Sequence, residues 1–135
     1  MDSKYINHYN SFCLSLAALS KATTRDLQDS FVISGTVQKF TLTFDISWKV
    51  MKDIVVKYYK ISDFASGSPR ECLRTAASVS LISDDNWMNM LTLRNNLTHD
   101  YNGSLAESSV HTILDVYLPL FNAFKIKAAE FVNIE

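Results

Sequence analysis

An arginine, a histidine and a tyrosine follow one another closely in the run Arg-Asn-Asn-Leu-Thr-His-Asp-Tyr, as Arg94, His99 and Tyr101. A guanidinium, an imidazole and a phenol can all contact a phosphate group through hydrogen bonds. The run spans about two helical turns, so the three side chains start close together along the chain. These residue types in this spacing indicate chemistry on phosphate.

Helical geometry places two of these groups on an apolar helix face. At about 100° per residue, Trp87 lies about 20° to one side of Arg94 and Tyr101 about 20° to the other, in the middle of an apolar sector. His99 falls on a neighbouring polar row with Asn95 four residues before it. The two rows converge near the predicted helix end, where long side chains from adjacent faces can contact the same phosphate group.

Two interpretations of this cluster stay open on residue types alone. An arginine on an apolar face can simply meet a buried carboxylate, and a histidine near a helix C-terminus can complement the helix dipole. The functional interpretation rests on the coincidence of the three groups, and on the rule that arginine is rarely fully buried without a partner.

The elements that must position this run are predicted to be helices. Apolar residues recur at helical spacing along most of the chain, while only three glycines and two prolines interrupt it. The spacing predicts helices over residues 5–22, 37–59, 69–80, 83–99 and 104–129, and the β-branched residues of 31–37 leave the start of the second one undefined. Pro119 predicts a kink in the last helix.

Three local signals mark where helices begin. Ser68 followed by Pro69 is typical of a cap and a first helical position. Ser83 precedes two aspartates and is expected to cap the fourth helix, with the acids favoured by the helix dipole. Ser104, three residues before Glu107, predicts a capping box for the last helix. Long helices with short joins predict an all-α, up-and-down antiparallel bundle of four to five helices.

Composition limits the class of protein. With 135 residues and 47% apolar content, the chain is long enough for one buried core, so residues 1–135 are expected to form a single domain. The net charge of −1 and the pI of about 6.3 exclude a global basic field, so DNA is not an expected partner and any RNA contact needs a local patch. No signal peptide or membrane span is read, which predicts a cytoplasmic protein without membrane contact.

The remaining reactive residues predict no metal site and no cofactor. Cys13 and Cys72 lack metal-ligand spacing and are expected to be reduced, buried thiols. His8 and His111 have no acid or serine at triad-like spacing, so core or surface roles are expected.

Two further groups are assigned structural roles. Lys49, Lys52 and Lys57 give the second helix a basic side, which is expected to be solvated, with RNA contact as the alternative. Trp48 and Trp87 are expected in the core.

Five short segments of the chain carry a resemblance to a known family: 39–49, 68–71, 87–91, 94–101 and 117–121. In this order they resemble the nucleotidyltransferase substrate-binding proteins, a family of HEPN domains close to the HepT toxins. The likeness runs from about Val32 to Phe124. Its most specific part is the HEPN motif of an arginine, a polar residue and a histidine, here Arg94, Asn95 and His99, in the extended form that ends in Tyr101.

The resemblance implies a helical bundle that forms a homodimer and brings two motifs together in a cleft. It also implies a partner, a minimal nucleotidyltransferase (MNT). In HepT members the dimer is a metal-independent endoribonuclease, and the partner silences this toxin by transferring AMP to the motif tyrosine. Carried over, Arg94 and His99 are the catalytic residues, Tyr101 is the modification site, and Asn95 and Asp100 are supporting polar residues.

These roles are chemically consistent with the side chains. Cleavage of RNA without a metal needs a proton acceptor for the 2′-hydroxyl, which His99 can supply, and positive charge for the phosphate, which Arg94 can supply. A free phenol has a pKa of about 10, so Tyr101 needs a base from the partner before it attacks. The sequence thus predicts the HepT-like component of a toxin–antitoxin pair. The alternative is a noncatalytic substrate-binding subunit of a two-component nucleotidyltransferase.

Overall fold

The computed structural model of the chain describes residues 3–132, and in this part of the chain every regular element is helical. In chain order the elements are α1 (Ser3–Ser20), the 3₁₀ turn η1 (Lys21–Thr24), α2 (Ser30–Lys57), α3 (Pro69–Ser78), α4 (Asn86–Leu97), α5 (Ser104–Thr112), the π-helical segment η2 (Ile113–Tyr117) and α6 (Leu118–Val132). The predicted all-α, up-and-down bundle is confirmed.

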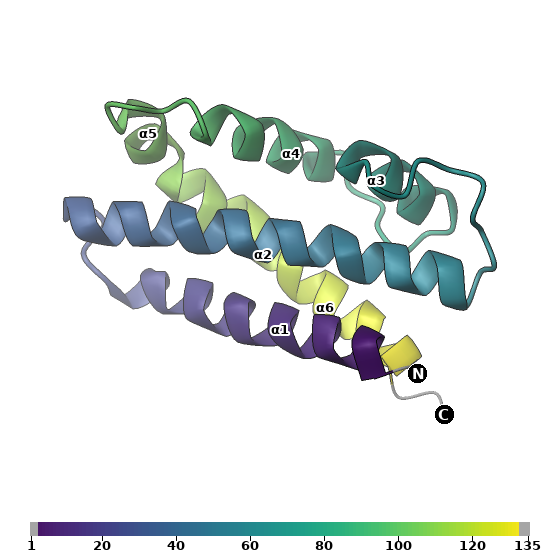
Figure 1. Ribbon diagram of the computed structural model, residues 1–135. Coiled ribbons are helices and arrows are strands. Elements are labelled where there is room, and N and C mark those ends of the chain that lie inside the picture. The colour runs from purple at the N-terminus through teal and green to yellow at the C-terminus, as the bar shows by residue number, and fades with distance from the viewer. Residues whose placement is uncertain (1–2, 133–135) are drawn as a thin grey trace.

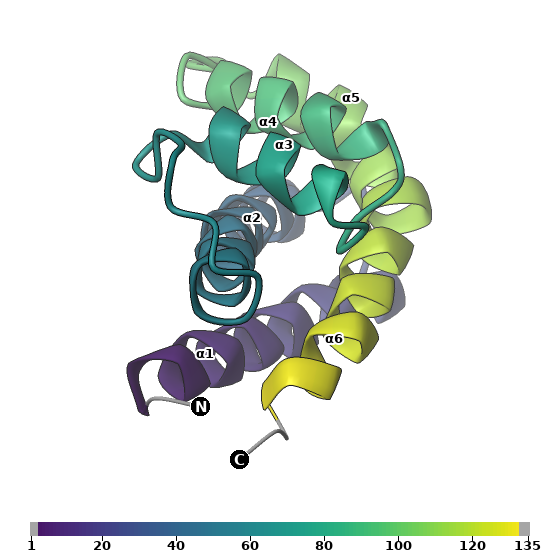
Figure 2. The same cartoon turned by 90° about the vertical axis from the view of Figure 1, so that its right-hand side faces the viewer.

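The long helix α2 forms the axis of the bundle. In Figure 1, α1 runs antiparallel along one side of α2, α3 and α4 lie along the opposite side, and α6 crosses behind it. Seen from the end in Figure 2, these elements surround a common interior. The β-branched residues near the start of α2 do not delay it, because Asp29 caps it by accepting a hydrogen bond from the amide of Phe31 at 2.8 Å.

The interior is built from aromatic rings that come from four helices. Phe12 of α1 lies 5.6 Å from Phe124 of α6, and Phe40 of α2 stacks on Tyr117 at 5.7 Å, both between ring centroids. Trp87 of α4 makes an edge contact with Phe121 at 5.6 Å. Such pairs each add about 0.5–1.5 kcal/mol beyond area burial, and they tie α1, α2, α4 and α6 into one core.

One buried polar contact fixes how α1 and α2 face each other. The hydroxyls of Ser15 and Thr43 lie 2.7 Å apart in the interior. Thr43 donates its own proton to the carbonyl oxygen of Lys39 at 2.7 Å, so Ser15 donates to Thr43. A slip of either helix would leave the buried hydroxyl of Ser15 without this partner, which costs about 1–3 kcal/mol.

The last predicted helix is divided in two by a wide turn. The predicted kink appears as the π segment, in which the amide of Leu118 donates to the carbonyl of Ile113. Pro119 follows directly and has no backbone N–H to continue the helical hydrogen bonds, so the π segment lies where a helical bond is missing. No helix of the described residues is long and apolar enough to cross a membrane.

Of the first two helix-start predictions, one is confirmed and one is wrong. Ser68 caps α3 by accepting a hydrogen bond from the amide of Glu71 at 3.3 Å, as predicted. Ser83 is not the cap of α4: Asp84 accepts from the amide of Asn86 at 2.7 Å, and the helix begins there. Asp84 accepts this hydrogen bond in place of Ser83 because it is one residue closer to the first free amides of the helix.

Candidate functional site

The helix that carries the motif ends earlier than predicted. α4 stops at Leu97, and residues 98–103, called the motif loop from here on, form turns. The prediction that helix continued to His99 is wrong, and so are the angular positions of His99 and Tyr101 derived from it. Thr98 contributes to this ending, because its hydroxyl donates to the carbonyl of Asn95 at 2.6 Å.

Arg94, the one member of the motif trio on the helix, is held by a carboxylate of α2. Its Nε donates to Oδ1 of Asp45 at 2.9 Å and its Nη2 to Oδ2 at 2.8 Å, a bidentate ion pair. Both side chains are 29% exposed. The hydrogen bond from Arg94 to Asp45 raises the pKa of the guanidinium, and burial opposes this rise. The structure therefore shows the first of the two interpretations, in which Arg94 pairs with a carboxylate.

Sequence reasoning did not find Asp45 as the partner. The two residues are 49 positions apart, and nothing in their local spacing connects them. One signal was present: Asp45 is a charged residue between the buried Phe44 and the buried Ser47 of α2. A charged residue at the margin of an apolar face needs a partner of opposite charge. Arg94 is also a charged residue on an apolar helix face, so the two residues could have been matched.

A pocket of about 350 Å³ lies beside this ion pair, between α2, α4 and the start of α5. This motif pocket is lined by residues that include Ser34, Gln38, Thr41, Arg94, Thr98 and Asp100. Its polar groups are hydroxyls, an amide, the ion-paired guanidinium and the carboxylate of Asp100. The pocket therefore offers hydrogen-bond donors beside a charge that Asp45 has already neutralised.

Asp100 has a structural role that the motif did not predict. Its Oδ1 accepts from the amide of Leu105 at 3.0 Å and its Oδ2 from the amide of Ala106 at 2.7 Å, so it caps α5. Ser104 makes no side-chain cap bond, and the predicted capping box is wrong. Gly103 turns the chain into α5 with φ of 76°, a conformation that favours glycine. The carboxylate reaches α5 because this turn folds the chain back.

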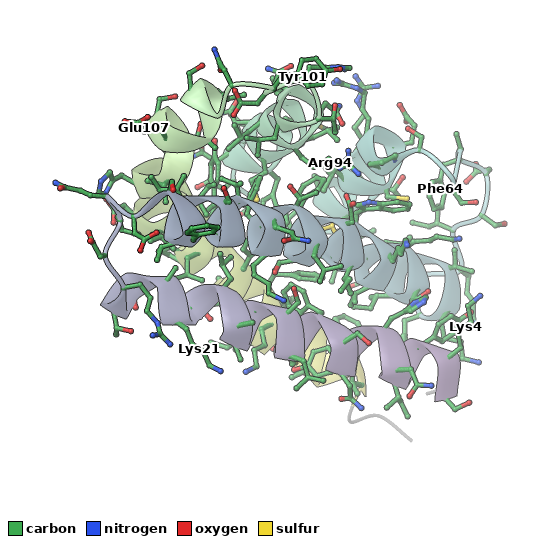
Figure 3. All side chains as sticks on the ribbon, turned by 60° about the vertical axis from the view of Figure 1, so that its left-hand side comes forward. Lys4, Lys21, Phe64, Arg94, Tyr101 and Glu107 are labelled. Atoms are coloured by element: carbon green, nitrogen blue, oxygen red, sulfur yellow. The ribbon has the colours of Figure 1, made fainter. Side chains whose placement is uncertain are left out.

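His99 and Tyr101 do not line the motif pocket. Both side chains are exposed, Tyr101 at 91%, and within residues 3–132 neither makes a side-chain hydrogen bond. Asn95 is exposed as well. Figure 3 shows Arg94 directed from α4 toward α2, and Tyr101 at the outer edge of the molecule. The protomer thus brings Arg94 and Asp100 to one pocket and leaves His99 and Tyr101 on the surface.

The remaining histidines, cysteines and carboxylates of the described residues lie outside the motif pocket. No group of three or more His, Cys, Asp and Glu side chains could hold a metal ion within residues 3–132. Cys72 is buried as expected, and burial raises the pKa of its thiol to about 11. Cys13 is only half-buried, contrary to expectation. His8 binds Asp53, a partner that the sequence did not indicate because the two residues lie 45 positions apart.

The fold defines the class of protein, an all-helical bundle, and Arg94, His99 and Tyr101 lie at the end of α4 and in the motif loop after it. The model of the family described as "Nucleotidyltransferase substrate binding protein like" matches residues 5–130, and the chain belongs to this family. A search of the curated proteins finds no match.

A solved structure shares the fold. HI0074 from Haemophilus influenzae, described as revealing the fold of a substrate binding domain of a nucleotidyltransferase, aligns with a TM-score of 0.67. The alignment covers 94% of this chain and 98% of HI0074 at 20% sequence identity. At this identity the likeness shows the bundle fold alone.

Proposed function

We propose that the chain is the protein partner of a minimal nucleotidyltransferase, and that Tyr101 accepts a nucleotidyl group from it. The observation that carries this proposal is the exposure of Tyr101, which is 91% exposed in the motif loop. A phenol that enters another protein's active site must project from the surface and must not be tied by its own chain. Tyr101 meets both conditions within the described residues.

The motif loop holds this phenol in a defined place although the side chain is free. Asp100 precedes Tyr101 and is anchored to the two amides of α5, and Gly103 closes the turn after it. The phenol is therefore presented on a fixed loop, which lowers the entropy lost when a partner binds it.

The transfer itself is a phosphoryl-group substitution. A base of the partner takes the phenol proton of Tyr101, and the phenolate oxygen attacks the α-phosphorus of ATP. The new O–P bond forms as the bond between the α-phosphorus and the bridging oxygen breaks, and pyrophosphate leaves. The nucleotidyltransferase supplies the catalytic groups, so this chain contributes only the acceptor and the surface around it.

The test is mass spectrometry of the purified chain after incubation with a minimal nucleotidyltransferase and ATP. The expected result is a mass increase of one AMP on the peptide that contains Tyr101, and none in Tyr101→Phe. Tyr59→Phe is the matched control, because Tyr59 is another exposed tyrosine and lies outside the motif. Modification that survives Tyr101→Phe, or that disappears in Tyr59→Phe, contradicts the proposal.

A second candidate function is the metal-independent endoribonuclease of a HepT-like toxin, built from two copies of the chain. The observation that favours it is the exposure of the His99 imidazole on the same loop, next to a pocket that Arg94 lines. Within one protomer Arg94 is neutralised by Asp45 and His99 points outward, so a single copy does not assemble the site. A homodimer that faces two motif loops toward each other would place each imidazole near the partner's pocket.

Cleavage of RNA by the purified dimer tests this second function. The double variant Arg94→Ala/His99→Ala is expected to lose cleavage by two or more orders of magnitude, the usual loss when a positioned acid–base is removed. His111→Ala is the matched control, because His111 is exposed on α5 away from the motif loop. Cleavage that is equal in the double variant and the wild type excludes an endoribonuclease built on this motif.

A further inference from the structure

An uncharged stripe of four residues runs along the exposed side of α2 near its start. Its members are Phe31, Gly35, Gln38 and Leu42, all of them exposed, and they are called the α2 stripe from here on. Their spacing of four, three and four residues places them on one face of the helix. Within residues 30–44 Lys39 is the one charged residue, and it lies about 80° around the helix from Phe31.

The α2 stripe borders the motif pocket. Gln38 belongs to the stripe and also lines the pocket, while Thr98 and Asp100 line it from the motif loop. Tyr101 follows Asp100 directly. Figure 1 shows α5, which follows the motif loop, next to the start of α2. The stripe therefore lies on the α2 side of a pocket of about 350 Å³, and Tyr101 lies on the loop that forms its other side.

Phe31 and Tyr101 are the two most exposed large apolar side chains of the described residues, at 88% and 91%. Aromatic side chains are enriched at the centres of protein interfaces, where a few of them supply most of the binding energy. An interface of standard size covers about 800 Å² of each partner. A protein that takes Tyr101 into its active site is therefore large enough to cover the α2 side of this small pocket as well.

We propose that the α2 stripe is the surface on which the partner nucleotidyltransferase docks, with the ring of Phe31 seated in an apolar depression of that enzyme. The inference rests on the proposed function, because it takes the transferase to be the protein that receives Tyr101. The stripe is uncharged, so it holds the two proteins together without placing a further charge beside the triphosphate of ATP. It positions the phenol and takes no part in the transfer itself.

Gly35 offers a substitution that blocks the stripe and leaves the fold intact. A Cβ added at this position meets nothing within 4 Å, and the backbone φ is not positive. Lysine has a higher helix propensity than glycine, so Gly35→Lys should keep or raise the melting temperature. Gly67→Lys is the matched control, because Gly67 is equally open but lies in the loop before α3, beyond the other end of α2.

The measurement is isothermal titration of the full chain with a minimal nucleotidyltransferase, in the Tyr101→Phe background, which separates docking from transfer. Gly35→Lys and Phe31→Ala are expected to weaken binding about tenfold or more, as the loss of an aromatic anchor does. Gly67→Lys should bind like the parent, and so should Leu14→Ala, which truncates an exposed apolar residue of α1. With Tyr101 restored, the two stripe variants should raise the KM for the chain in AMP transfer and leave kcat unchanged.

Three results would overturn the proposal. One is equal affinity of Gly35→Lys and Gly67→Lys for the transferase, and another is no binding of the parent chain. The third concerns a second copy of the chain as the occupant: light scattering should give the same mass with and without Gly35→Lys, and a dimer that this variant separates would make the stripe a self-interface.

Failure of the docking surface is distinguishable from failure of the proposed function. Weakened binding of the stripe variants, with no AMP on Tyr101 in any chain, would support the docking surface and contradict Tyr101 as the acceptor. AMP on Tyr101 with an unchanged KM in Gly35→Lys and Phe31→Ala would support the acceptor and overturn the docking surface.

Discussion

At the scale of single residues, Arg94 is held by one carboxylate, that of Asp45. Within the protomer its guanidinium is bound on two nitrogens by Asp45, a geometry that matches a carboxylate fork. A phosphate presents oxygens in a similar arrangement, so a substrate phosphate would compete with Asp45 for the same donors. The exposure of 29% for each side chain leaves the pair within reach of solvent and ligands.

The strength of this pair can be measured by a double-mutant cycle with Arg94→Ala and Asp45→Ala. We expect a coupling energy of about 1 kcal/mol in urea unfolding, because the pair is bidentate but partly screened by solvent. The exposed pair of Arg74 and Glu71, at 3.0 Å and three residues apart on α3, is the control and should give about 0.2–0.5 kcal/mol. A coupling no larger than that of the control would show that Asp45 does not hold Arg94.

At the scale of elements, the motif loop is defined by how α4 ends and α5 begins. The end of α4 at Leu97 places His99 and Tyr101 on turns, and the cap from Asp100 sets the direction of α5. A longer α4 would have turned Tyr101 toward the apolar face. Because α4 stops early, the Tyr101 phenol, predicted to lie on the apolar helix face, is exposed instead.

The cap predicts a contrast between two neighbouring polar residues. Asp100→Ala should lower the free energy of unfolding by about 1–2 kcal/mol, because it leaves two amides of α5 without their acceptor. Ser104→Ala should change it by much less, since Ser104 makes no cap bond. Hydrogen exchange at the amides of Leu105 and Ala106 should accelerate in the first variant only. A larger effect of Ser104→Ala would restore the capping box that the sequence predicts.

At the scale of the whole molecule, burial in the folded bundle raises the pKa of several weak acids. Burial raises the pKa of the Cys72 thiol to about 11 and that of the Tyr9 phenol to about 12, and it also raises the pKa of Tyr117. These residues lie on α3, α1 and η2, where Cys72 and Tyr117 are buried and Tyr9 is half-buried. Their ionisation is therefore coupled to unfolding of the bundle as a whole.

Stability is expected to fall as pH rises above about 9. The unfolded chain loses these protons at the ordinary pKa values of 9.0 for Cys72 and 10.0 for the tyrosines, while the folded chain keeps them until higher pH. The unfolded state then binds fewer protons, so the free energy of unfolding decreases with pH. The measurement is urea unfolding at pH 8, 9 and 10.

Two variants identify the groups responsible for this slope. Tyr117→Phe removes one buried phenol and retains the ring that stacks on Phe40, so it should flatten the decline near pH 10. Tyr101→Phe removes a phenol that is 91% exposed and serves as the control. The same flattening in both variants would mean that the slope does not come from burial.

The sequence by itself determined the all-helical bundle, the start of α3 at Ser68 and Pro69, and the family, because periodicity and local motifs depend on near neighbours along the chain. The tertiary structure alone decided the partner of Arg94, the cap of α5 and the pairing of His8 with Asp53. Arg94 and Asp45 lie 49 positions apart, and His8 and Asp53 lie 45 apart. Which turns of two helices face each other depends on how the whole core packs, so contacts at such separations are decided only when the bundle assembles.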